Sequence, residues 1–133
     1  MIVVDASVVV PALVSSTGFG ASAREVMGVN VEQIAAPALL DVEVSSAIRR
    51  LERSGEIPTP TAEGGMAVLA GMRIERFTHE PLLRRMWELR HNVTSYDAAY
   101  VALAERLEAP LVTLDARLAK ASGIRCSIRM IGG

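Results

Sequence analysis

The chain has 133 residues, half of them hydrophobic, and a net charge of −1. This length fits one domain, residues 1–133, with a sizeable core, and the near-neutral charge excludes a protein that binds nucleic acid by bulk positive charge. Any attraction for phosphate must therefore be local or delivered by a metal ion. The lone Cys126 excludes an intramolecular disulfide, and Asp5 interrupts the first apolar stretch, which argues against a signal peptide or a membrane-spanning helix. We expect a soluble cytoplasmic protein without membrane association.

Short apolar runs alternate with helical stretches along the whole chain. In order, the sequence predicts a strand at 2–5, helices at 6–14 and 19–28, a strand at 33–36, helices at 38–54 and 60–71, a strand at 74–77, helices at 80–91 and 96–108, a strand at 111–114, a helix at 116–122 and a strand near 126–130. Gly64 and Gly65 weaken one of these helices by about 1 kcal/mol each. Such alternation is typical of βαβ units. We therefore predict an α/β fold, a three-layer α/β/α sandwich with a mostly parallel sheet.

Three of the four aspartates stand where a parallel sheet would bring them together. Asp5 and Asp115 each end an apolar run that we predict to be a strand, and Asp97 opens a predicted helix. A carboxylate at the end of a strand points to the crevice outside the carboxyl end of the sheet, where open α/β folds bind ligands. Carboxylates that lie close together resist joint ionisation, and a divalent cation relieves that repulsion. The spacing therefore predicts a metal site and, with it, phosphate chemistry.

A fourth acidic ligand is expected from the helix at 38–54, which offers Asp41 and Glu43. With a step of about 100° per residue, both side chains lie roughly 80° from the centre of the apolar stripe, on opposite flanks. The periodicity does not choose between them. Hard carboxylate oxygens without a nearby pair of His or Cys residues suit Mg²⁺ or Mn²⁺ and disfavour zinc.

Three segments carry a resemblance to a known family: MIVVDASVVVPALV at 1–14, APALLDVEVSSAIRRLE at 36–52 and TSYDAAYVALAERLEAPLVTLDARLAKASG at 94–123. Together with the chain length, they resemble the PIN-domain nucleases, in particular the small VapC-type toxins of prokaryotic toxin–antitoxin pairs. The resemblance extends from Met1 to about Ile131. It implies a five-stranded parallel sheet between helices.

The family has a quartet of acidic residues that bind metal and catalyse the reaction. On this chain the quartet maps onto Asp5, Glu43, Asp97 and Asp115. The resemblance thus favours Glu43 over Asp41, and it implies Mg²⁺, with Mn²⁺ as a substitute, as the cofactor. We expect Asp5 and Asp97 to be the principal ligands. Ser7 and Thr113 occupy positions where the family often has a small hydroxyl beside its aspartates.

Two further residues lie close to the quartet in the sequence. Arg117 follows Asp115 by two positions and is a candidate either for binding substrate phosphate or for holding a carboxylate of the site. Tyr100 lies one helical turn after Asp97, and we assign it to packing rather than to stacking on a base.

The activity that the resemblance implies is endonucleolytic cleavage of RNA by a metal-activated water, which leaves 5′-phosphate and 3′-hydroxyl ends. A toxin of this kind needs restraint, so the resemblance also implies a small cognate antitoxin over the cleft, and the family often forms homodimers. Two other functions stay open: a non-catalytic binding module with the same fold, and an aspartate-dependent phosphatase or phosphotransfer domain. The second is disfavoured because Asp5-Ala6-Ser7 lacks the second acid that haloacid-dehalogenase phosphatases require.

Overall fold

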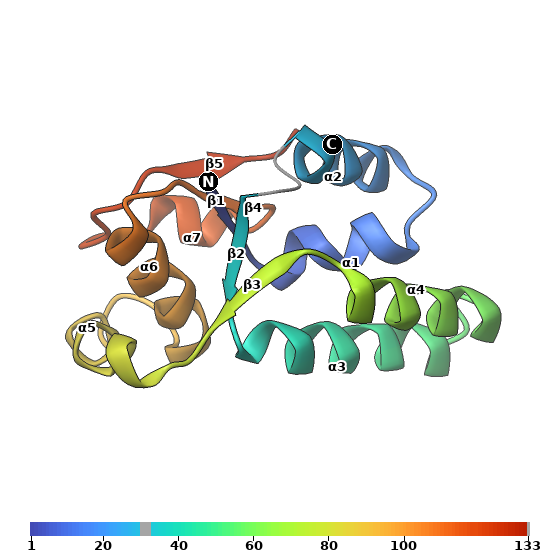
Figure 1. The fold of residues 1–133 in the computed structure, drawn as a ribbon, viewed down its shortest axis with the longest axis horizontal. Coiled ribbons are helices and arrows are strands. Elements are labelled where there is room, and N and C mark those ends of the chain that lie inside the picture. Colours follow the sequence, from blue (N-terminus) through green and yellow to red (C-terminus); the bar gives the residue numbers. More distant parts are fainter. Residues whose placement is uncertain (30–32, 133) are drawn as a thin grey trace.

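The computed structural model describes residues 1–29 and 33–132, and this part of the chain forms five strands and seven α-helices (Figure 1). The strands are β1 (Ile2–Val4), β2 (Ile34–Pro37), β3 (Ile74–Phe77), β4 (Leu111–Thr113) and β5 (Ile128–Met130). The helices are α1 (Ala6–Val14), α2 (Gly18–Val29), α3 (Leu39–Arg53), α4 (Thr59–Gly71), α5 (Leu83–Glu88), α6 (Ser95–Leu107) and α7 (Ala116–Lys120). A short 3₁₀ turn, η1 (Glu80–Leu82), precedes α5.

All five strands run parallel, in the order β3-β2-β1-β4-β5. Helices α1 to α4 lie on one side of the sheet and α5 to α7 on the other (Figure 1). This arrangement confirms the predicted α/β/α sandwich. From β1 the chain builds outward through β2 to β3 and then crosses back to β4 and β5. The neighbouring strands β1 and β4 therefore continue into helices on opposite sides of the sheet.

The strands are apolar on both faces because helices cover both faces. Val3, Val4, Leu111 and Val112 are fully buried, which explains why these runs show no alternation of polar and apolar residues. Helix α6 packs on β1, β2 and β4, and every residue from 98 to 104 is buried. Because α6 leads from the carboxyl edge of the sheet back to the start of β4, its first turn lies at the carboxyl edge of the strands.

Three predicted elements differ from the structure by two residues or more. The helix expected at 116–122 is α7, which ends at Lys120. The helix expected at 80–91 is instead η1 followed by the short α5, which ends at Glu88. Leu89 is buried at that point, and the Asn92 side chain donates a hydrogen bond to Ser122 Oγ (2.9 Å), so the chain turns towards α6 instead of continuing as a helix. The last strand begins at residue 128 rather than 126, after a turn in which Gly123 has a φ of +81°.

None of the described helices is long and apolar enough to cross a membrane by itself. Helices α1 and α2 reach the required length and composition only as a pair, across a bend of 109°. In the folded chain Val8, Val9 and Ala23 of this pair are buried in the core.

Candidate active site

The carboxyl ends of β1 and β4 form the centre of the candidate site. These two strands are paired in parallel. Since they continue into helices on opposite sides of the sheet, a crevice opens beyond their ends, at the position where open α/β sheets bind ligands. Asp5 directly follows β1, and Asp115 lies two residues after the end of β4. The two carboxylates therefore lie at the same edge of the sheet, as the sequence predicted.

Two hydroxyl groups hold the Asp5 carboxylate. Ser7 Oγ donates to its Oδ1 (2.5 Å), and Thr113 Oγ1 donates to its Oδ2 (2.6 Å). Each hydroxyl in turn accepts a backbone N–H: Leu114 donates to Ser7 Oγ (2.9 Å), and Asp115 donates to Thr113 Oγ1 (3.0 Å). A hydroxyl has only one proton to donate, and both protons are directed at Asp5. Ser7 and Thr113, the supporting residues expected from the sequence, thus fix the Asp5 side chain in one orientation.

The Asp5 carboxylate is difficult to ionise without a cation. Asp5 and Thr113 are the two buried polar residues of the described chain. The pKa of Asp5 is raised from 3.8 to about 6, mainly by burial and to a smaller extent by the charge of Asp97, although both hydroxyl hydrogen bonds act in the opposite direction. A cation near Asp5 would favour the charged form and reverse this shift.

Asp97 is the electrostatic neighbour of the other three acids. It lies in the first turn of α6, where its backbone N–H donates to the capping Thr94 Oγ1 (3.1 Å). Burial raises the pKa of Asp97, and the charge of Asp115 adds to this effect. Asp97 in turn raises the pKa of both Asp5 and Glu43. Residues from three separate parts of the chain are therefore coupled through this one carboxylate.

The two acids of α3 point in different directions. Glu43 Oε1 accepts a hydrogen bond from the hydroxyl of Tyr100 on α6 (2.6 Å). Asp41 instead forms an ion pair with Arg76 of β3, with 2.9 Å between Nη2 and Oδ1 and 3.2 Å between Nε and Oδ2. Burial raises the pKa of Glu43, the Tyr100 hydrogen bond opposes this shift, and Asp97 adds to it. Glu43 thus faces the site, and Asp41 faces the edge strand.

The hydroxyl of Tyr100 is a site feature that sequence reasoning missed, because the residue was assigned to packing. The side chain is indeed buried, with 1% exposed. Burial raises the pKa of Tyr100 above its ordinary range, and Glu43, Asp5 and Asp97 raise it further, so the hydroxyl keeps its proton and acts as a donor. A signal was available in the sequence: a buried tyrosine hydroxyl normally has a partner, and residues three apart share a helix face.

Asp115 caps α7 and is paired with an exposed arginine. Its Oδ1 accepts the backbone N–H of Arg117 (2.9 Å), and the Arg117 guanidinium Nη2 lies 3.4 Å from Oδ2. Partial burial acts to raise the pKa of Asp115, but the hydrogen bonds and charge of Arg117 outweigh it and lower the pKa. The Arg117 side chain is 92% exposed, and an exposed pair of this kind is weak. The pair with Asp115 therefore holds the Arg117 side chain only weakly.

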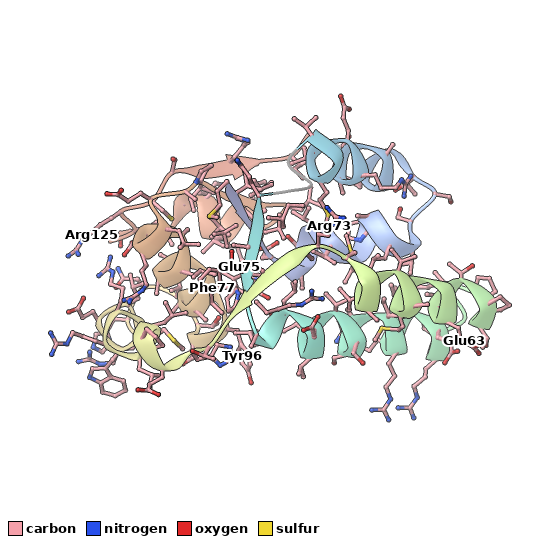
Figure 2. The ribbon with its side chains drawn as sticks, in the orientation of Figure 1. Glu63, Arg73, Glu75, Phe77, Tyr96 and Arg125 are labelled. Carbon is pink, nitrogen blue, oxygen red and sulfur yellow. The ribbon has the colours of Figure 1, made fainter. Side chains whose placement is uncertain are left out.

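A groove of about 860 Å³ extends from the site between α1 and α3. Ser7 and Glu43 line the end nearest the acids, and Tyr96 lines it beside the start of α3 (Figure 2). The Tyr96 side chain is exposed and has no hydrogen bond within the described chain. Farther along, Leu51 contributes apolar surface and Arg50 contributes a positive charge. The groove thus joins an acidic end to a mixed apolar and basic end.

The donor set fits Mg²⁺ chemistry. Within residues 1–29 and 33–132, no three His, Cys, Asp or Glu side chains are arranged to enclose a metal ion. Mg²⁺ does not require such an enclosure, because it keeps several waters and is usually bound by one or two carboxylates. Asp5 and Asp97 offer two carboxylates whose pKa values are raised by burial, and a cation would relieve the cost of ionising them together.

The chain is similar to PIN-domain ribonucleases both by family model and by individual relatives. Residues 2–124 match the family model described as the PIN domain. Ribonuclease VapC1 of Mycobacterium tuberculosis is 47% identical to the chain over 131 residues, which cover 97% of this chain and 96% of that protein. PIN-domain ribonucleases are generally metal-dependent.

Solved structures share the fold. The crystal structure of M. tuberculosis VapC20, a sarcin–ricin loop cleaving toxin, is similar with a TM-score of 0.70 and 14% identity, and the match covers 94% of this chain and 97% of that chain. The VapBC2 structure of Rickettsia felis, bound to a DNA fragment from its promoter, is similar with a TM-score of 0.73 and 13% identity, over 99% of this chain and 100% of that chain. At these identities the likeness concerns the fold alone.

Proposed function

We propose that this chain, which belongs to the PIN-domain family and within it to the VapC ribonuclease toxins, cleaves RNA endonucleolytically with Mg²⁺, or with Mn²⁺ in its place. The observation that carries the proposal is the coupling of four acids at the carboxyl ends of β1 and β4. These acids are Asp5, Glu43, Asp97 and Asp115. Asp5, Glu43 and Asp97 resist ionisation in this crevice, and such a group of carboxylates is suited to a divalent cation and, through it, to a phosphodiester.

Each acid has a distinct part in this proposal. Asp5 and Asp97 would be the principal ligands of the ion, and Asp115 would hold the ion or one of its waters. When bound, Mg²⁺ supplies positive charge beside the scissile phosphate and stabilises the charge that develops on its oxygens. The rigid hold of Ser7 and Thr113 on Asp5 supports the role of Asp5 as a fixed ligand.

Glu43 is the candidate for orienting the attacking water, or for binding a second ion. Tyr100 occupies its Oε1, and its Oε2 has no hydrogen bond within the described residues. This free oxygen can accept a proton from water, and the raised pKa of Glu43 makes it a stronger base at neutral pH. Arg117 would leave Asp115 to bind a phosphate oxygen of the RNA. The products would be a 5′-phosphate and a 3′-hydroxyl end.

The partner proposed for this toxin in the cytoplasm is a small antitoxin, and the groove between α1 and α3 supports this. Val10, Pro11 and Leu51 give the groove an apolar wall against which an apolar helix face can pack. Its acidic end suits an arginine of the partner, which would compete with the metal ion. The VapBC2 complex of R. felis supports such a pairing. We also propose that the chain forms a homodimer, which gel filtration of the isolated chain would detect.

The test is incubation of the purified chain, free of any partner, with cellular RNA and Mg²⁺. We expect discrete cleavage products that carry 5′-phosphates, no cleavage with EDTA, and a loss of at least about 100-fold in the Asp97→Asn variant. Cleavage by Asp97→Asn at the parental rate would contradict the assignment of the site. Intact RNA with the parental protein and Mg²⁺ would instead favour a non-catalytic binding module.

A further inference from the structure

We propose that Tyr100 is a positioning residue that holds Glu43 in place for cleavage; this inference rests on the proposed ribonuclease activity. The Tyr100 hydroxyl lies 2.6 Å from Glu43 Oε1. Glu43 makes no other hydrogen bond within the described chain, so this contact alone fixes the direction of its carboxylate. A glutamate side chain has three rotatable bonds, and one short hydrogen bond at its tip removes much of that freedom.

The contact joins the two helical layers at the site. Glu43 belongs to α3, which packs with α1 and α4 on one side of the sheet, and Tyr100 belongs to α6 on the other side. Tyr100 lies one turn after Asp97 on the same helix, so the helix that carries Asp97 also determines where Glu43 points. The ring of Tyr100 is anchored in the core, with 1% exposed. The donor is thus rigid, whereas Glu43 is only partly buried.

A tyrosine hydroxyl suits this task for a chemical reason. It is a neutral donor, so it directs Glu43 without adding a positive charge that would compete with a cation for the carboxylates, as a lysine or arginine would. It occupies one oxygen of Glu43 and leaves Oε2 available for water. The expected effect of Tyr100 is therefore on the rate of the chemical step and not on the binding of RNA.

The test compares two conservative variants. The chain has two tyrosines, so the second one, Tyr96, can serve for comparison with Tyr100. Tyr100→Phe keeps the buried ring and removes the hydroxyl, and Tyr96→Phe removes the exposed hydroxyl at the groove as a matched control for the NMR measurement. We expect Tyr100→Phe to lower kcat by about tenfold or more, the usual effect of losing a hydrogen bond to a charged group, with KM for RNA unchanged. Asp41→Asn, on the same helix as Glu43 but paired with Arg76 away from the site, should leave both constants unchanged. In the metal-free protein, the NMR signal of the Glu43 side-chain carboxyl carbon should shift in Tyr100→Phe and not in Tyr96→Phe.

A double-mutant cycle separates positioning from a structural role. In a Glu43→Ala background, the additional Tyr100→Phe change should lower the residual rate no further. If Tyr100→Phe reduced the rate equally with and without Glu43, or cleaved at the parental kcat, this inference would be wrong while the proposed ribonuclease activity stood. If the parental protein itself cleaved no RNA, the proposed function would be wrong and this inference with it.

Discussion

The Asp5 carboxylate accepts two hydroxyl hydrogen bonds and still has a pKa of about 6. The hydroxyls favour the charged form, so the cost of burial must exceed their effect. In the metal-free protein, the folded state therefore binds a proton at Asp5 more tightly than the unfolded chain, in which the pKa is near 3.8. By linkage, the stability from this proton is fully present below pH 3.8 and is lost as the pH rises through about 6.

Replacing Asp5 by asparagine should stabilise the metal-free protein at neutral pH, because asparagine fills the same space without a buried charge. A shift of about two pKa units corresponds to up to about 3 kcal/mol. Thermal unfolding in EDTA from pH 4 to pH 8 would measure this: the gain in Tm of Asp5→Asn over the parent should grow between pH 4 and 7 and then level off. A gain that did not depend on pH would contradict the account, and the variant should also lose RNA cleavage.

The two acids of α3 should respond differently to the loss of charge. Glu43→Gln should lower the cleavage rate by about 100-fold, because an amide cannot accept a proton from water. Asp41→Asn should leave cleavage unchanged and destabilise the fold slightly, since Asp41 is partly exposed and its partner Arg76 is on β3. Single-turnover cleavage and thermal unfolding of both variants check this. The reverse pattern, with Asp41→Asn inactive, would show that the other flank of α3 forms the site.

Periodicity could not choose between Asp41 and Glu43, because both flank the apolar stripe of α3 at similar angles. The direction of each side chain depends on a residue far away in the sequence, Arg76 for Asp41 and Tyr100 for Glu43. Contacts of this kind leave no periodic signal in one sequence. By contrast, Asp5 and Asp115 could be placed at one edge of the sheet without coordinates, because the parallel arrangement of their strands determines it.

At the scale of elements, α4 contains two adjacent glycines with different surroundings. A Cβ added at Gly65 would lie 2.8 Å from Val14 Cγ1 of α1, whereas a Cβ at Gly64 would meet nothing within 4 Å. Gly65 is buried where α4 crosses α1, and Gly64 is exposed. From the sequence alone, both glycines are predicted only to lower the helix propensity of α4. The structure gives Gly65 a packing reason, namely the close approach of two helices.

The glycine pair therefore offers a matched prediction. Gly64→Ala should stabilise the protein by about 1 kcal/mol, the difference in helix propensity. Gly65→Ala should destabilise it by about 1–2 kcal/mol, because valine is stiff and α1 or α4 must shift to admit the methyl group. Urea denaturation of both variants measures the difference. Stabilisation by both changes would mean that the contact between α1 and α4 is looser than described.

An element boundary can be predicted from the sequence when its cause lies nearby in the chain, and not when its cause is a distant contact. The strand at 74–77 and the helix at 60–71 were expected with nearly the bounds observed, since apolar runs and breakers such as Pro58 act locally. The segment at 80–91 was expected as one helix and is not, because its end is determined by the burial of Leu89 and by the contact of Asn92 with Ser122. The core that buries Leu89 and the hydrogen-bond partner Ser122 both lie outside the segment.

At the scale of the whole molecule, a chain with a net charge of only −1 concentrates negative charge at one edge of its sheet. The folding topology brings the acids together from β1, α3, α6 and the end of β4, and Arg117, which is paired with Asp115, is largely exposed. The folded state thus has a local repulsion that the unfolded chain lacks. A ligand that neutralises it must bind the folded state selectively and stabilise it.

Mg²⁺ or Mn²⁺ should therefore raise the melting temperature of the metal-free protein. At a free ion concentration about 100 times Kd, the gain is about 2.7 kcal/mol, which for a domain of this size corresponds to roughly 10 °C. Differential scanning calorimetry across a metal titration checks the effect, with Asp41→Asn as the matched control that should keep it and Asp97→Asn as the variant that should lose it. Because Asp97 is coupled to the other acids, its neutralisation removes both a ligand and the repulsion that the ion relieves. Equal stabilisation of Asp97→Asn and the parent would place the ion elsewhere and contradict the assigned site.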